Sequence, residues 1–179
     1  MPSLDKKLNQ FKTDIEHQIT DVFNVFSQAC ALQKEHLDIK FDALLLNIRK
    51  VKSLAFRDVK NHFIRNENSY YHYFDMREKQ VELLKRVTYL LERIATHDPI
   101  LKNISQLMSE ISNNVNSNDY TDLRLHSLYE IRLSLDKLPL PRSHQALNSR
   151  ANIIQFLNEL EEYLNLKSQF GSLRLHSEI

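Results

Sequence analysis

The chain has 179 residues, of which 42% are apolar and 26% charged, and 24 Lys and Arg against 23 Asp and Glu give a formal net charge of +1. This length and apolar fraction predict one globular domain over residues 1–179, and so small a charge supplies no broad electrostatic attraction for nucleic acid. One Gly and four Pro are fewer than tight hairpins and phosphate-binding loops require, which disfavours a β-rich fold and excludes a Gly-rich nucleotide site.

Signatures of metal binding and catalysis are missing from the sequence. Cys30 is the only cysteine, so an intramolecular disulfide and a multi-cysteine zinc site are excluded. No histidine follows a Glu by three residues, the pair that di-metal helical bundles use, and no Gly-x-Ser-x-Gly motif is present. No apolar run approaches the roughly 18 residues that a membrane span needs. We therefore expect a non-enzymatic chain without a metal or another cofactor.

Apolar residues recur at steps of three and four along most of the chain, which is the spacing of one face of an α-helix. The first stripe, for example, begins at Leu4 and Leu8 and continues beyond Phe26. Six helices are predicted in this way, at about 4–32, 41–63, 69–96, 100–111, 120–138 and 144–170.

Turn signals separate the predicted helices. Asn and Ser residues at 66–69 predict a turn with Ser69 as an N-cap, and Pro99 ends the third helix. The polar stretch 112–118 predicts a flexible loop. Ser143 is the predicted cap of the last helix, which we expect to end near Gly171. Together, the helical periodicity and the turn signals predict an all-α antiparallel bundle of about five or six long helices with short links.

The predicted second helix carries a basic face. Residues 40–65 hold seven basic side chains against two acidic ones, and four of the cations lie opposite the apolar stripe: Arg49, Lys50, Arg57 and Lys60. This pattern is typical of a solvated outer face, and it also suits a surface for anionic lipid headgroups or another acidic partner. The acidic cluster of Glu159, Glu161 and Glu162 on the last helix is a competing internal partner.

The predicted third helix places a cation within an aromatic and apolar stripe. Tyr70, Tyr73, Phe74 and Arg77 share this face. A buried guanidinium needs a partner, and Glu159 and Glu161 beside the stripe of the last helix are the predicted ones. The alternative is a pocket in which Arg77 grips the carboxylate of a small aromatic acid while tyrosine rings stack on it.

Residues 69–84 read Ser-Tyr-Tyr-His-Tyr-Phe-Asp-Met-Arg-Glu-Lys-Gln-Val-Glu-Leu-Leu, and the segments 138–142, 148–151 and 156–164 follow later in the chain. In content, order and spacing these segments resemble the C-terminal domain of the putative aromatic acid exporter family of bacteria. The aromatic, Met-Arg and Gln pattern of that family falls on Tyr70, Tyr73, Phe74, Met76, Arg77 and Gln80, and its proline-bounded turn falls on Pro139 and Pro141. The chain departs from the family pattern at Asp75, where Glu is usual, and at Asn148-Ser149, where an acidic residue and Asn are more typical.

The resemblance implies a domain that follows a membrane portion of several helices and lies on the cytoplasmic side of the cell membrane. The chain would then be a fragment, and its expected partners are the membrane portion of the same chain, further copies of it and an anionic lipid surface. The function that this implies is a non-catalytic regulatory or oligomerisation domain of an exporter. Two alternatives stay open, a sensor that binds an aromatic carboxylate at Arg77 and an independent helical adaptor without a membrane portion.

Overall fold

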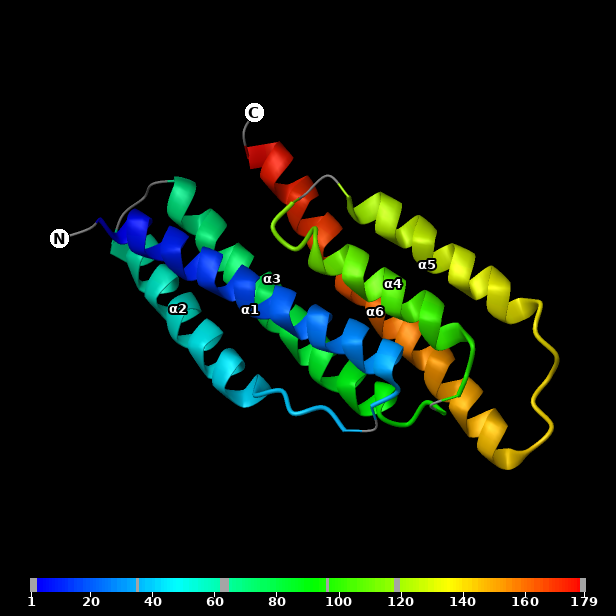
Figure 1. The fold of residues 1–179 in the computed structure, drawn as a ribbon. Helices are drawn as coiled ribbons and strands as arrows, with labels where there is room; N and C mark the ends of the chain where they lie inside the picture. The colour runs from blue at the N-terminus through cyan, green and yellow to red at the C-terminus, as the bar shows by residue number, and fades with distance from the viewer. Residues whose placement is uncertain (1–2, 35, 62–64, 96, 118–119, 178–179) are drawn as a thin grey trace.

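The structure is a computed structural model that describes residues 3–34, 36–61, 65–95, 97–117 and 120–177, with side chains described at 3–34, 36–57, 70–95, 97–117 and 120–171. In these residues the chain forms helices and no strand, which confirms the predicted all-α class (Figure 1). The helices are α1 (Leu4–Leu32), α2 (Phe41–Asn61), α3 (Arg65–Leu91), α4 (Ile100–Ser112), α5 (Thr121–Asp136) and α6 (His144–Ser177).

Consecutive helices run antiparallel, and the long ones share one buried apolar cluster (Figure 1). α1 packs closely on α4, α2 on α3, and α3 on α6. The remaining helix, α5, contacts only α4 and α6 among the described helices and lies at the edge of the bundle opposite α2 (Figure 1). α2 and α5 therefore lie at opposite edges of the bundle (Figure 1).

The helix termini agree with the predicted ones where a cap is present. α1 spans the predicted residues, and the hydroxyl of Ser3 accepts a hydrogen bond from the backbone N–H of Lys6 at 3.3 Å. Ser143 caps α6 by accepting from the backbone N–H of Ala146 at 3.1 Å. Both contacts satisfy amide groups that the first turn of a helix leaves without an internal partner.

Three predicted boundaries are wrong, and one of them is the end of α3, which lies at Leu91, five residues before the predicted end at 96. α3 begins at Arg65, so the predicted turn at 66–69 is helical, because Asn and Ser disfavour a helix only weakly. α6 runs through Gly171 to Ser177 instead of ending there. A single Gly costs a helix only about 1 kcal/mol relative to Ala, and helix propensity alone does not decide where a long helix ends.

Cys30 is buried in the core near the end of α1, with 4% of its surface exposed. Burial raises the pKa of its thiol to about 12, so the thiol stays protonated at neutral pH. Since the thiolate is the reactive form, Cys30 fills space in the core rather than performing chemistry.

Candidate functional site

Arg77 lies at the centre of the buried face of α3, as the sequence predicts. Its side chain is only 2% exposed. Tyr73 lies four residues before it and Gln80 three residues after it, so both share its face of the helix. Phe74 is fully buried beside them, and the ring of Tyr70 stacks on that of Phe74 with 6.2 Å between centroids. Of the aromatic residues named from the sequence, Tyr73 contacts Arg77 directly, and Phe74 packs against both Tyr73 and Tyr70.

Each nitrogen of the Arg77 guanidinium donates a hydrogen bond. Nε donates to the hydroxyl of Tyr73 at 2.9 Å, Nη1 to Oε1 of Gln80 at 2.9 Å, and Nη2 to the carbonyl oxygen of Val115 at 2.8 Å. The guanidinium carbon also lies 5.1 Å from the centre of the Tyr73 ring, within range of a cation–π contact. The bond to Val115 connects α3 to the segment that follows α4.

The carboxylate nearest to Arg77 belongs to Glu16 of α1, with Oε1 3.9 Å from Nη2. The hydroxyl of Tyr73 bridges the two residues, because it accepts from Arg77 and donates to Oε1 of Glu16 at 2.8 Å. Burial raises the pKa of Tyr73, so this bridging hydroxyl keeps its proton. The buried charge is therefore balanced by α1.

The prediction that Glu159 and Glu161 pair with Arg77 is wrong. Glu159 lies 3.4 Å from Nε of Arg86, and Glu161 lies 2.7 Å from Nη2 of Arg132. Both glutamates flank the buried stripe of α6, so their carboxylates meet arginines near the surface instead of reaching the core. The sequence shows that they lie beside the stripe, but not which neighbouring helix each side of α6 faces.

Gln80 and Lys167 connect the Arg77 region to α6. Gln80 is fully buried and donates from Nε2 to the carbonyl oxygen of Tyr163 at 2.9 Å. Lys167, which is 8% exposed, donates to the carbonyl oxygen of Asn114. Burial, together with the charge of Arg77, lowers the pKa of Lys167 to about 8. We call Glu16, Tyr73, Arg77, Gln80 and Lys167 the Arg77 cluster.

The sequence analysis missed three parts of this arrangement, Glu16, Lys167 and the carbonyl of Val115. Lys167 could have been identified from the sequence. It occupies the next position of the buried stripe that contains Leu160 and Leu164, in the same way that Arg77 occupies a position in the buried stripe of α3. Val115 lies in the polar stretch predicted as a flexible loop, yet it is 2% exposed and held by Arg77.

The described cavity beside the Arg77 cluster is small. It measures about 10 Å³ and lies among α4, α5 and α6, with Val115, Tyr163 and Lys167 in its wall. That volume accommodates about one water molecule, whereas pockets for drug-sized molecules hold several hundred Å³. The hydroxyl of Tyr163 is buried and forms no hydrogen bond with good geometry among the described residues.

The basic face of α2 is partly neutralised by α3. Nη2 of Arg49 lies 3.1 Å from Glu82, and Nζ of Lys52 lies 3.2 Å from Asp75. In contrast, Lys50 and Arg57 are exposed and form no ion pair with any residue that the structure describes. The side chain of Lys60, the fourth predicted member of this face, lies outside the described residues.

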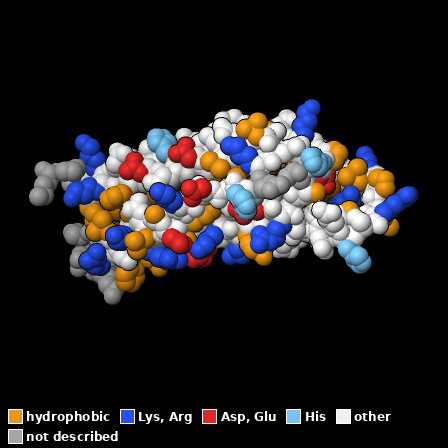
Figure 2. All heavy atoms as spheres, turned by 60° about the horizontal axis from the view of Figure 1, so that its bottom comes forward, with side chains coloured by type: hydrophobic (Ala, Val, Ile, Leu, Met, Phe, Trp, Pro, Cys, Tyr) orange, Lys and Arg blue, Asp and Glu red, His pale blue; other side chains and the backbone are white. Residues whose placement is uncertain are grey.

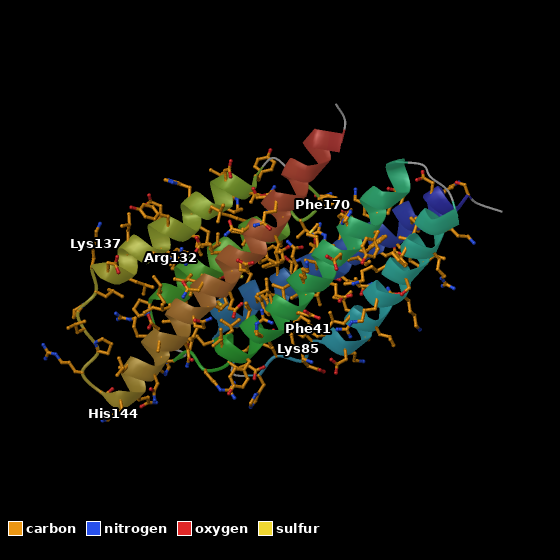
Figure 3. The ribbon with its side chains drawn as sticks, turned by 180° about the vertical axis from the view of Figure 1, so that it is seen from behind. Phe41, Lys85, Arg132, Lys137, His144 and Phe170 are labelled. Carbon is orange, nitrogen blue, oxygen red and sulfur yellow. The ribbon has the colours of Figure 1, made fainter. Side chains whose placement is uncertain are left out.

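A second feature, which the sequence analysis did not identify, is an open groove at the other edge of the bundle. The link between α5 and α6, from Lys137 to His144, curves away from the bundle (Figure 3). The groove beside it has a volume of about 500 Å³. Its wall is mostly apolar, with three charged side chains: Arg132, Leu135, Asp136, Leu138, Leu140, Pro141, Leu147, Arg150, Ile154 and Leu157. We call it the α5–α6 groove.

Two kinds of feature are absent from the residues that the structure describes. No group of three or more His, Cys, Asp or Glu side chains in them could hold a metal ion. None of the helices in the described part of the chain is long and apolar enough to cross a membrane.

Comparison with known proteins gives a family and a fold. The family model of the putative aromatic acid exporter C-terminal domain matches residues 5–168. The uncharacterized protein YqjA of Bacillus subtilis (strain 168) is 30% identical over 175 residues, which are 97% of this chain and 54% of that protein, so the chain spans about half of its length. The crystal structure of a putative membrane protein from Clostridium difficile 630 superimposes with a TM-score of 0.76 at 15% identity, over 92% of this chain and 99% of that one, and shows the same fold.

Proposed function

The chain belongs to the family of putative aromatic acid exporter C-terminal domains, and we propose that it is a non-catalytic assembly domain, which joins exporter subunits through its outer surface. The observation that carries this proposal is the α5–α6 groove, with its apolar wall and with two charged side chains, Asp136 and Arg150, that form no ion pair among the described residues. In this role the bundle is a rigid body that transmits the position of one subunit to the next.

The apolar side chains of the α5–α6 groove are unusually exposed. Leu140 is 85% exposed, Leu147 is 53% and Ile154 is 49%. Leu147 and Ile154 lie seven residues apart on one face of α6, so they form a continuous stripe with the link. A contiguous exposed apolar surface of this kind marks a contact with another protein more often than a surface that faces water.

The charges of the groove favour a second copy of the chain as the partner. Nε of Arg150 is buried without a hydrogen-bond partner, and the exposed Asp136 forms no ion pair among the described residues. Asp136 also ends α5, where the helix dipole disfavours a carboxylate. A two-fold axis through the groove would bring Arg150 of each subunit against Asp136 of the other, because a two-fold interface uses the same patch twice.

The contacts of Arg77 support a structural role over the alternative of a carboxylate sensor. Its three nitrogens donate to groups of the protein itself, and the described cavity beside it holds about one water molecule. The bonds tie α3 to Glu16 of α1, to the segment after α4 and, through Gln80, to α6. This internal bonding suits a bundle that moves as one body.

Sedimentation equilibrium of the purified chain tests the proposal. We expect a concentration-dependent dimer, and we expect Leu147→Asp to raise the dissociation constant at least about tenfold, because it buries an unpaired charge in the interface. Leu46→Asp is the matched control, since Leu46 has a similar exposed fraction of 55% but lies on α2. A wild-type chain that stays monomeric at about 100 μM, or equal effects of the two variants, would exclude this interface.

A further inference from the structure

A groove also runs along the opposite edge of the bundle, between α1 and α2. It forms because α2 packs mainly on α3 and makes few contacts with α1. The groove has a volume of about 540 Å³, with Phe11 of α1 on one side and residues 46–57 of α2 on the other. Its wall combines apolar, basic and neutral polar side chains: Phe11, Leu46, Asn47, Arg49, Lys50, Val51, Ser53, Leu54 and Arg57. We call it the α1–α2 groove.

Among the residues whose side chains are described, no acidic one lines this groove, and its basic side chains differ in how they are paired. Arg49, at its border, contacts Glu78 and Glu82 of α3. Lys50 and Arg57 lie seven residues apart on the outward side of α2 and have no carboxylate partner among the described residues. The groove therefore presents two positive charges that are available to an anionic partner.

Exposed apolar side chains accompany these free charges. Leu46 is 55% exposed and lies one helical turn before Lys50. In the view that brings α2 forward, hydrophobic side chains mix with Lys and Arg toward the end of the molecule where the chain begins (Figure 2). This combination suits the interface of an anionic bilayer, where lipid phosphates meet cations and apolar side chains enter the headgroup boundary.

The place of the groove in the fold favours a membrane as its occupant. α1 begins at the same end of the bundle at which α2 ends, close to Arg57 (Figure 1). In a family of C-terminal domains, the rest of the protein joins at the start of the domain. A membrane portion before the domain, which the family resemblance implies, would therefore join at this end.

We propose that the α1–α2 groove docks on anionic lipid bilayers, with Lys50 and Arg57 contacting lipid phosphates and Leu46 entering the interface. This surface lies on the opposite side of the bundle from the α5–α6 groove. Docking and self-association are therefore separable, and either can fail without the other.

Vesicle co-sedimentation of the 179-residue chain tests docking. Vesicles of 30% phosphatidylglycerol and 70% phosphatidylcholine are expected to retain the chain at low salt, and vesicles of phosphatidylcholine alone are not. Each juxtamembrane cation contributes about 1 kcal/mol, so Lys50→Gln with Arg57→Gln should weaken binding about thirtyfold. Leu46→Gln should weaken it further, and salt at about 0.5 M should abolish it.

A charge-matched control separates docking at the groove from general attraction. Lys34→Gln with Lys102→Gln removes two exposed cations elsewhere in the chain, and we expect it to bind like wild type. The proposal would be overturned if neutral and anionic vesicles retained the chain equally. It would also be overturned if the double variant of Lys50 and Arg57, the groove variant, bound anionic vesicles like wild type, or if the control variant lost as much vesicle binding as that variant. The groove variant should keep its melting temperature and self-association, which shows that it is folded and that a loss of lipid binding is independent of assembly.

Discussion

Arg77→Met is expected to lower the free energy of unfolding by about 3–5 kcal/mol, the typical loss when one partner of a buried charge pair is removed. The variant leaves Oε1 of Gln80 and the carbonyl of Val115 without their donor, and it leaves the Glu16 carboxylate without its nearest cation. Buried acceptors without a donor are costly because they have also lost water. Guanidinium denaturation measures the loss directly, and the melting temperature should fall by roughly 10 °C.

Arg86→Met is the control for this effect. Arg86 pairs with Glu159 at 3.4 Å, but its side chain is 56% exposed, and such surface pairs contribute about 0–1 kcal/mol. If Arg77→Met and Arg86→Met lowered the free energy of unfolding by similar amounts, this would contradict the structural role of Arg77. A second contradiction would come from benzoate, if it raised the melting temperature of the wild type but not that of Arg77→Met, because only a ligand bound at Arg77 would do so.

Lys167 is expected to make the stability of the chain rise with pH between about 8 and 9. Burial lowers the pKa of Lys167 from 10.5 to about 8 in the folded state. Between these values the unfolded chain holds a proton that the folded chain has released, so the free energy of unfolding increases by about 1.4 kcal/mol per pH unit from this residue. Below pH 8 both states are protonated, and the folded state keeps a buried ammonium at its full cost.

Lys167→Met isolates this contribution. At pH 7 the variant should be more stable than wild type by about 1–2 kcal/mol, since relief of the buried charge exceeds the lost hydrogen bond to the Asn114 carbonyl. The difference should vanish or reverse by about pH 9.5. The raised pKa values of Cys30 and Tyr73 act in the opposite direction, because those groups ionise more readily in the unfolded chain, but they are common to both proteins and cancel. A difference that does not change between pH 7 and 9.5 would show that Lys167 keeps its ordinary pKa.

The sequence predicts the helices well because each one buries a stripe whose spacing is visible in the chain. Leu8, Ile15 and Ile19 are fully buried on α1, and their spacing alone marks that helix. The burial of Arg77 is predictable for the same reason, because a single cation interrupts an apolar face. Helix ends are less predictable, as at Arg65 and Gly171, and also at Leu91, where α3 ends well before Pro99.

The partners of Arg77 depend on how the helices are arranged in space, which periodicity does not contain. Glu16 is 61 positions away on α1, between residues that give it no special signal, whereas Glu159 and Glu161 look suitable only because they flank a buried stripe. The apolar stripe of a helix predicts which of its faces is buried, but it does not predict which other helix packs against that face. The α5–α6 groove is also not predictable from the sequence, because it depends on the path of the link from Lys137 to His144.

The most direct test of the assembly role is a charge exchange across the proposed two-fold interface, measured by sedimentation equilibrium. Asp136→Arg and Arg150→Asp should each weaken the dimer, because each places like charges against one another. The double variant carries both charges in exchanged positions, and we expect it to recover the dissociation constant of the wild type within about threefold. If the double variant instead loses the summed dimerisation free energy of the two single variants, Asp136 and Arg150 do not meet across subunits. This result would contradict the proposed interface.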